Sequence, residues 1–167
     1  MDIDADGNID LVVSYFEEDK IVWYQNLGGG VFSSQQLIAS GLNNARGVTG
    51  ADLDGDGDMN LVLGVTNGSG LYWVENLDGQ GNFGSLTNIA PGLSSARRQR
   101  LGDMDGDGDI DVVSNGTNPW LLWFENVDGE GDFSMQHTIE AQGLYENAFD
   151  IEDLDGDGDL DIVSGKK

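Results

Sequence analysis

The chain has 167 residues, of which 31 are acidic and 7 are Lys or Arg, so its formal net charge at pH 7 is −24. A charge of this sign excludes a general nucleic-acid binder, which needs a basic face. The absence of cysteine excludes disulfides, cysteine-based zinc sites and thiol nucleophiles, and no apolar run approaches the length that spans a membrane.

Acidic side chains are concentrated in four clusters. The clusters begin at Asp2, Asp52, Asp103 and Asp153, at spacings of 50, 51 and 50 residues. The intervening sequence repeats in step with the clusters, so we expect one uninterrupted array over residues 1–167 with no second domain. The repeat units fall at approximately 1–51, 52–102 and 103–152, followed by a partial unit at 153–167.

Each repeat unit is expected to contain four short β-strands. The first precedes an acidic cluster, as at residues 46–51, and the second is the continuous apolar run that follows it, as at residues 61–63. Such a run indicates a strand that is buried on both faces. The third strand carries an aromatic pair. The fourth follows a glycine-rich hairpin, as at residues 78–81, and begins near a recurring Phe.

Repeat units of this size and strand number are typical of propeller blades. The expected fold is therefore all-β, with tandem four-stranded propeller-blade-like repeats. The chain holds about three blades, fewer than the roughly four to eight of a closed propeller. A partial propeller within a larger ring, association with copies of itself, and an open solenoid or fibre are all compatible with this count. Met1 occupies the place that Ala51 has one unit later, so we expect the chain to belong to a longer protein.

Each acidic cluster forms a loop with the pattern Asp-x-Asp-x-Asp-Gly-x-x-Asp, in which Asn takes the ninth position once. We number these loops 1 to 4, at residues 2–10, 52–60, 103–111 and 153–161. Calcium takes about six to eight oxygen ligands, which side chains at positions 1, 3, 5 and 9 and the backbone carbonyl at position 7 can supply. Glycine at position 6 permits the sharp turn. The sequence therefore predicts up to four Ca²⁺ ions, one in each loop.

The residues assigned to these sites contribute side chains at positions 1, 3, 5 and 9 and a backbone carbonyl at position 7. They are Asp2, Asp4, Asp6, Asn8 and Asp10 in loop 1; Asp52, Asp54, Asp56, Asp58 and Asn60 in loop 2; Asp103, Asp105, Asp107, Asp109 and Asp111 in loop 3; and Asp153, Asp155, Asp157, Asp159 and Asp161 in loop 4. At ~4 Å and an effective dielectric constant near 20, two carboxylates repel by roughly 4 kcal/mol. A divalent ion removes this repulsion, so we expect the loops to be ordered only when loaded.

An EF-hand is the alternative calcium motif, and the sequence excludes it. It needs flanking helices and a bidentate Glu at loop position 12, whereas position 12 here is Val or Leu in loops 1 and 2 and Ser in loops 3 and 4. Magnesium fits less well, because it prefers few carboxylates and several waters. Loops 1 and 4 lie at the ends of the array, where we expect neighbouring strands to be missing. The calcium prediction therefore rests mainly on loops 2 and 3.

Three segments together resemble FG-GAP/VCBS-type repeats, a group that includes the integrin α-subunit propellers. They are Asp-Leu-Asp-Gly-Asp-Gly-Asp-Leu-Asp-Ile-Val at residues 153–163, Trp-Phe-Glu-Asn at residues 123–126, and the Asp-Gly-x-Gly-x-Phe hairpins. The resemblance spans the whole chain and implies a β-propeller-like fold, calcium in each loop and an extracellular or cell-surface location. Asn60 stands where the family usually has Asp, which implies weaker binding in loop 2.

Residues outside the loops have structural and functional interpretations. We expect Trp23, Trp73 and Trp123 to pack between blades, Glu75 and Glu125 to make a repeated structural hydrogen bond, and His137 to lie at a surface or hairpin position. Trp120 is a possible exposed contact for a sugar or a protein, or else a lid on the local core. Arg97, Arg98 and Arg100 either balance nearby Asp charge or recognise an anionic glycan or a partner carboxylate. Asn67 and Asn115 begin possible glycosylation sequons.

These features predict a non-catalytic, extracellular calcium-binding β-repeat module with a structural or adhesive role. It would assemble with copies of itself or form part of a larger propeller or fibre in a longer parent chain. A lectin-like glycan-binding module and a non-catalytic appendage of a secreted enzyme are the alternatives. Glycans and cell-surface proteins are possible partners, whereas nucleic-acid binding and membrane insertion are not expected.

Overall fold

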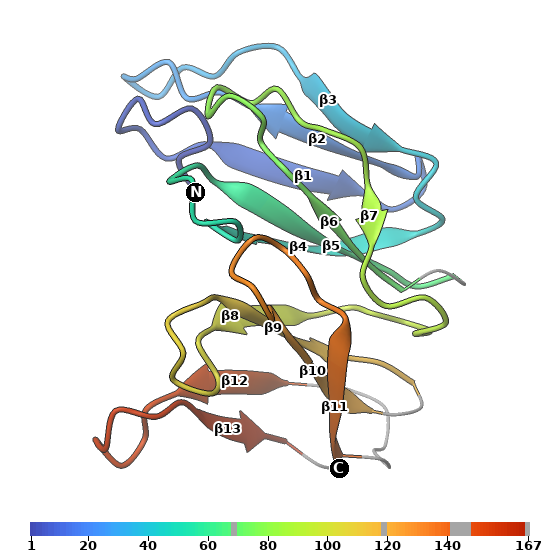
Figure 1. The fold of residues 1–167 in the computed structure, drawn as a ribbon. Coiled ribbons are helices and arrows are strands. Elements are labelled where there is room, and N and C mark those ends of the chain that lie inside the picture. Colours follow the sequence, from blue (N-terminus) through green and yellow to red (C-terminus); the bar gives the residue numbers. More distant parts are fainter. Residues whose placement is uncertain (68–69, 118–119, 141–147, 166–167) are drawn as a thin grey trace.

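The computed structural model describes residues 1–67, 70–117, 120–140 and 148–165, which form antiparallel strands and contain no helix (Figure 1). The strands are β1 (Leu11–Tyr15), β2 (Lys20–Tyr24), β3 (Gln36–Ser40), β4 (Ala45–Ala51), β5 (Asn60–Val65), β6 (Leu71–Val74), β7 (Thr87–Asn88), β8 (Gln99–Gly102), β9 (Asp111–Asn115), β10 (Leu121–Glu125), β11 (Met135–Glu140), β12 (Phe149–Glu152) and β13 (Asp161–Ser164).

The strands form four separate sheets, each built from strands that are consecutive in sequence. We call the sheets blade 1 (β1–β3), blade 2 (β4–β7), blade 3 (β8–β11) and blade 4 (β12–β13). The prediction of an all-β array of four-stranded units is confirmed by blades 2 and 3, and the array is open. Each complete blade begins with the strand before a loop, so blade 2 spans residues 45–88 and crosses the boundary between the first two sequence units.

The fourth strand of a blade begins two to four residues after the recurring Phe, near the place that the sequence predicts. In blade 2 the recurring Phe83 forms an isolated bridge with Asn76, and β7 begins four residues later, at Thr87. The Phe therefore closes the hairpin instead of opening the strand. β7 has only two residues, whereas β3 has five and β11 has six.

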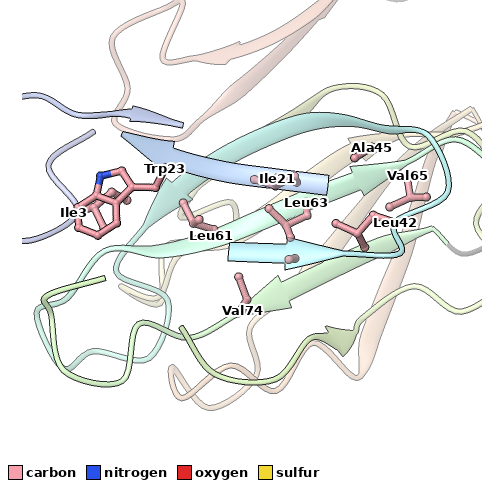
Figure 2. Close-up of a cluster of buried hydrophobic side chains, with 10 residues drawn as sticks. Ile3, Ile21, Trp23, Leu42, Ala45, Leu61, Leu63, Val65 and Val74 are labelled. Carbon is pink, nitrogen blue, oxygen red and sulfur yellow. The ribbon is translucent and has the colours of Figure 1, made fainter. Parts of the chain in front are cut away.

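Hydrophobic cores lie between successive blades. On β5, Leu61 and Leu63 belong to the core shared with blade 1, whereas Val62 belongs to the core shared with blade 3. Figure 2 shows the first of these cores, in which Ile21 and Trp23 of β2 lie near Leu61 and Leu63. Side chains alternate between the two faces of a strand, so a strand that is covered on both faces must be apolar throughout. The prediction of strands buried on both faces is confirmed for β5 and β9. It is wrong for β1 and β13, where Leu11 and Val163 are each 49% exposed because no further blade of the described residues covers that face.

The recurring tryptophans pack across the blade boundaries onto glycines of the next hairpin. A Cβ atom on Gly81 of blade 2 would overlap the ring of Trp23 of blade 1, and one on Gly131 of blade 3 would lie 2.7 Å from the ring of Trp73. Trp73 also meets the edge of Phe133, at a centroid separation of 6.4 Å. These contacts confirm inter-blade packing for Trp23 and Trp73, and they explain why the second glycine of the hairpin has no side chain.

Candidate metal centres

Loops 2, 3 and 4 each join the first strand of a blade to the second, and loop 1 leads into β1, which is equivalent to those second strands. The loops lie along one side of the array (Figure 1). In every loop the position-6 glycine donates its N–H to the position-1 carboxylate, at 2.9–3.0 Å. These glycines have φ values from +88° to +101°, which side-chain-bearing residues rarely adopt. In loops 1, 3 and 4, the position-9 Asp accepts the N–H of position 2 at 3.0–3.1 Å. The backbone of each loop therefore folds around its own carboxylates.

Carboxylate oxygens converge in all four loops. In each loop, one oxygen from each of three carboxylates lies within 4.8 Å of the other two. The sets are Asp2, Asp4 and Asp6; Asp52, Asp54 and Asp56; Asp103, Asp105 and Asp111; and Asp153, Asp155 and Asp161. Positions 1 and 3 contribute every time, and the third member is position 5 in loops 1 and 2 and position 9 in loops 3 and 4.

The side chain at loop position 7 lies away from the three converging carboxylates. The carboxylates of Asp58 and Asp109 lie against Gly79 and Gly129, which are hairpin glycines of the same blades. The sequence assigned a backbone carbonyl, not a side chain, to the metal at this position. Gly79 and Gly129 must lack side chains because these carboxylates occupy the space.

Three oxygens in loops 1 and 2 are buried without a hydrogen-bond partner: Oδ1 of Asp2, Oδ1 of Asp4 and Oδ1 of Asn60. Asp4 is 7% exposed and Asn60 is fully buried. A buried polar atom without a partner is costly, and the cost is greater for an oxygen that carries charge. A hard cation accepts several such oxygens at once. The donor set therefore fits calcium, which the resemblance to FG-GAP-type repeats implies.

The electrostatics of the loops also favour a cation. Burial, aided by the neighbouring charge of Asp56, raises the pKa of Asp54 to about 6. Burial likewise raises the pKa values of Asp4, Asp105 and Asp111 above their ordinary range. Each raised pKa reports a carboxylate whose charged form is unfavourable in the metal-free fold. A bound divalent cation would reverse that preference.

A Gln or Glu at the end of the third strand, or directly after it, faces the loops, and sequence reasoning missed this role. Gln25 donates from Nε2 to Oδ2 of Asp4 at 2.5 Å, and the charge of Glu75 contributes to the raised pKa of Asp54. In blade 3 the equivalent Glu125 pairs with His137 at 2.8 Å. The place of His137 in blade 2 is taken by Thr87, so this hydrogen bond is not the repeated one that the sequence predicts. Recurrence of Gln or Glu in register was the available signal.

In blade 3, His137 contacts Trp123 as well as Glu125. The two rings stack at a centroid separation of 4.2 Å, and His137 lies on β11, 38% exposed at its side chain. This agrees with the surface position expected for His137.

Of the residues predicted as ligand contacts, Trp120 is buried and Arg100 forms an ion pair. Trp120 is 5% exposed and belongs to the core between blades 3 and 4, so the prediction of an exposed contact is wrong and the alternative of a core lid holds. Burial is favoured because the indole completes this small core. Arg100 pairs with Asp150 at 2.5 Å and lowers the pKa of Asp150, as charge balance requires. Arg97 and Arg98 have exposed side chains.

The first residues of the two possible sequons occupy different environments. Asn115 ends β9, is fully buried, and accepts the backbone N–H groups of Arg97 and Arg98 at 3.1 and 2.9 Å. Its side chain is unavailable for modification in the folded chain, so the prediction at Asn115 is wrong. Asn67 is exposed, while Gly68 and Ser69 of its sequon, and Asn118 and Pro119 beside Trp120, lie outside the described residues.

The blades and loops together define a class of β-repeat proteins with an acidic loop in each repeat. The sequence model of the FG-GAP-like repeat family matches residues 2–63 and 103–164. Each matched segment runs from one Asp loop through the strand that follows the next loop. The chain belongs to the FG-GAP-like repeat family. No curated protein matches the chain. In the described residues, no helix is long and apolar enough to cross a membrane.

Proposed function

We propose that the chain is a non-catalytic, extracellular calcium-binding module with a structural or adhesive role. The observation that carries this proposal is the set of buried, unpartnered oxygens on Asp2, Asp4 and Asn60 beside converging carboxylates. FG-GAP repeats typically occur in extracellular proteins and are generally non-catalytic, which supports the location and the absence of a reaction.

Positions 1, 3 and 5 of each loop, with position 9 and the backbone carbonyl of position 7, would hold the ion. Bound calcium supplies positive charge that offsets the mutual repulsion of these carboxylates. The chain's own part is to turn the loop: the position-6 glycine ties the backbone to position 1, and the position-9 Asp ties it to position 2. The second strand position starts at or just after position 9, so an ordered loop fixes the start of that strand.

The partner we propose for this structural role is a further repeat of the same kind, from a second copy or an adjoining part of a longer chain. Leu11 of blade 1 is 49% exposed, whereas Leu61, its equivalent in blade 2, is fully buried under blade 1. Nothing lies within 4 Å of a Cβ placed on Gly30, whereas Trp73 fills the same place at Gly131. The outer face of blade 1 therefore has the shape that the other blades use for packing.

Glycan binding is a second candidate function, at a surface other than the one the sequence indicated. A hollow of about 460 Å³ lies where the short β7 meets the hairpin of blade 3. Its polar lining comprises Thr87, Asn88, Asp132, Ser134 and Gln136. This lining contains no basic side chain, so a neutral sugar suits it better than an anionic one. Titration of the labelled chain with neutral monosaccharides should move NMR signals of the hollow, and unmoved signals would reject this candidate.

Calorimetry tests the principal proposal. Titration of metal-free chain with calcium should show binding at affinities typical of extracellular modules, about 10⁻⁴ to 10⁻³ M. Magnesium at the same concentration is the control and should bind more weakly. A calorimetric trace without calcium-dependent heat, together with a melting temperature that chelator leaves unchanged, would reject the proposal.

A further inference from the structure

A side-chain amide at the end of β6 joins two blades. Asn76, which is fully buried, accepts the N–H of Gly81 in its own hairpin at 3.0 Å. Its Nδ2 donates to the carbonyl of Ile3 in loop 1 at 2.9 Å. The donor therefore belongs to blade 2 and the acceptor to the loop that precedes blade 1's first strand.

Blade 3 repeats this arrangement on loop 2. Asn126 accepts the N–H of Gly131 at 3.0 Å and donates to the carbonyl of Leu53 at 2.9 Å. Its backbone N–H also donates to Asp111 of loop 3 at 2.8 Å. Asn126 thus contacts loop 2 through its side chain, and loop 3 through its backbone N–H and a longer bond of 3.4 Å from Nδ2 to the carbonyl of Ile110.

Blade 2 donates a second side-chain hydrogen bond to loop 1, from Gln80. Blade 3 has no equivalent donor for loop 2. Gln80 donates from Nε2 to the carbonyl of Asp4 at 2.9 Å. The equivalent hairpin residue of blade 3 is Glu130, whose carboxylate has no N–H to donate. The carbonyls that accept these bonds are at loop positions 2 and 3, which leaves the position-7 carbonyl for the ion.

Resting on the proposed calcium function, we infer that Asn76, Gln80 and Asn126 are positioning residues that complete calcium loops 1 and 2 from the following blade. A loop whose backbone is already held loses less conformational freedom when the ion binds, so its affinity is higher. By thermodynamic reciprocity, an ion in loop 1 also strengthens the contact between blades 1 and 2. Leu154, at position 2 of loop 4, is 61% exposed, whereas Ile3 and Leu53 are each 1% exposed. Loop 4 therefore binds calcium more weakly than loop 1.

The position-6 glycines provide one NMR reporter for each loop: Gly7, Gly57, Gly108 and Gly158. Calcium titration of the ¹⁵N-labelled full chain follows their amide signals separately. In the unmodified chain, Gly7 should reach its midpoint at lower calcium than Gly158. Equal midpoints, or the reverse order, would contradict the inference.

Gln80→Met removes the donor at an exposed position without changing charge. One hydrogen bond corresponds to about a two- to ten-fold change in affinity, so the Gly7 midpoint should rise by that factor while the Gly158 midpoint stays fixed. Gln136→Met, at an exposed position on β11, is the control and should move neither. A folded Gln80→Met chain with an unchanged Gly7 midpoint would overturn the assignment of Gln80.

A gain-of-function pair at Glu130 isolates the donor from the charge. Glu130→Gln and Glu130→Met both remove one negative charge, but only Gln restores an N–H for the carbonyl of Asp54. Gly57 should reach its midpoint at about two- to ten-fold lower calcium in Glu130→Gln than in Glu130→Met. Identical Gly57 midpoints in the two variants would contradict completion from the following blade.

Failure of this inference can be distinguished from failure of the proposed function. If no glycine signal of the unmodified chain moves up to about 10 mM calcium, ten times the weakest affinity typical of extracellular modules, the calcium proposal fails. The positioning role is then decided by water exchange of the Gly7 amide in the metal-free chain. Gln80→Met should accelerate that exchange relative to Gln136→Met, and equal rates would reject the role.

Discussion

Loops 1 and 4 have the same pattern of acidic residues and opposite surroundings. The position-2 residue is 1% exposed in loop 1 (Ile3) and 61% exposed in loop 4 (Leu154). The position-3 carboxylate is buried in loop 1 (Asp4) and exposed in loop 4 (Asp155). The loop sequence turns the backbone in both places, but the hairpin of the following blade shelters loop 1. A calcium loop in this array is therefore built by two blades.

The largest expected effect is the loss of thermal stability when calcium is removed from the sheltered loops. A bound ion stabilises a fold by about 2.7 kcal/mol when its free concentration is about 100 times the dissociation constant. Loss of the ions from the two sheltered loops, 1 and 2, should therefore lower the melting temperature by roughly 10 °C or more. Thermal unfolding followed by circular dichroism, with and without chelator, measures the shift. Magnesium in place of calcium should not restore the original value.

Truncation at loop position 2 should separate the two loops sharply. Ile3→Ala should reduce the free energy of unfolding by about 2–5 kcal/mol, because it leaves a cavity under blade 2. Leu154→Ala should change it by no more than about 0.5 kcal/mol, because that side chain is already in water. Urea denaturation in calcium gives both values. Equal losses would show that the two loops are sheltered alike.

The raised pKa of Asp54 predicts a pH dependence of the metal-free chain. Its pKa lies near 6 in the fold, against 3.8 without the fold, so the folded state binds more protons between these values. Stability should therefore fall as pH rises from about 4 to about 6. Calcium competes with the proton and should bind more tightly over the same rise. Urea denaturation across this range measures the slope, which Asp54→Asn should reduce; a slope identical in both chains would contradict the assignment.

The smallest expected effect concerns the ion pair that links blades 3 and 4. Arg100 and Asp150 are both partly exposed, and such pairs contribute up to about 1 kcal/mol. Arg100→Ala should cost no more than that in urea denaturation and should cost less at high salt. A larger loss would mean that this pair, and not the hydrophobic core of Trp120 and Phe149 between blades 3 and 4, holds blade 4 in place.

Features that recur with the period of the repeat could be predicted from the sequence. The strands after loops 2 and 3 are buried on both faces, as their apolar runs indicate, and Trp23 and Trp73 recur because each fits a glycine of the next hairpin. The four loops were located by the same recurrence, and their carboxylates converge as expected.

Features set by a neighbouring blade could not be predicted from the motif. The sequence prediction rested on loops 2 and 3, yet loop 1 receives both Asn76 and Gln80. Those residues are more than 70 positions away, and nothing in loop 1 indicates them. Trp120 and Asn115 were misjudged for a similar reason: their burial depends on blade packing that has no local signature.

The hydrogen bonds from Asn76 and Asn126 give the array a direction. Loops 1 and 2 are completed by the blade that follows each of them. By the same rule, a blade added after the last one would complete a loop, whereas a blade added before the first one would complete none of the existing loops. The smallest segment that contains a whole binding unit is therefore longer than one period: for loop 1 it runs from residue 2 to residue 81. Gene duplications or engineered fusions that cut at the period of the sequence would separate a loop from the hairpin that secures it.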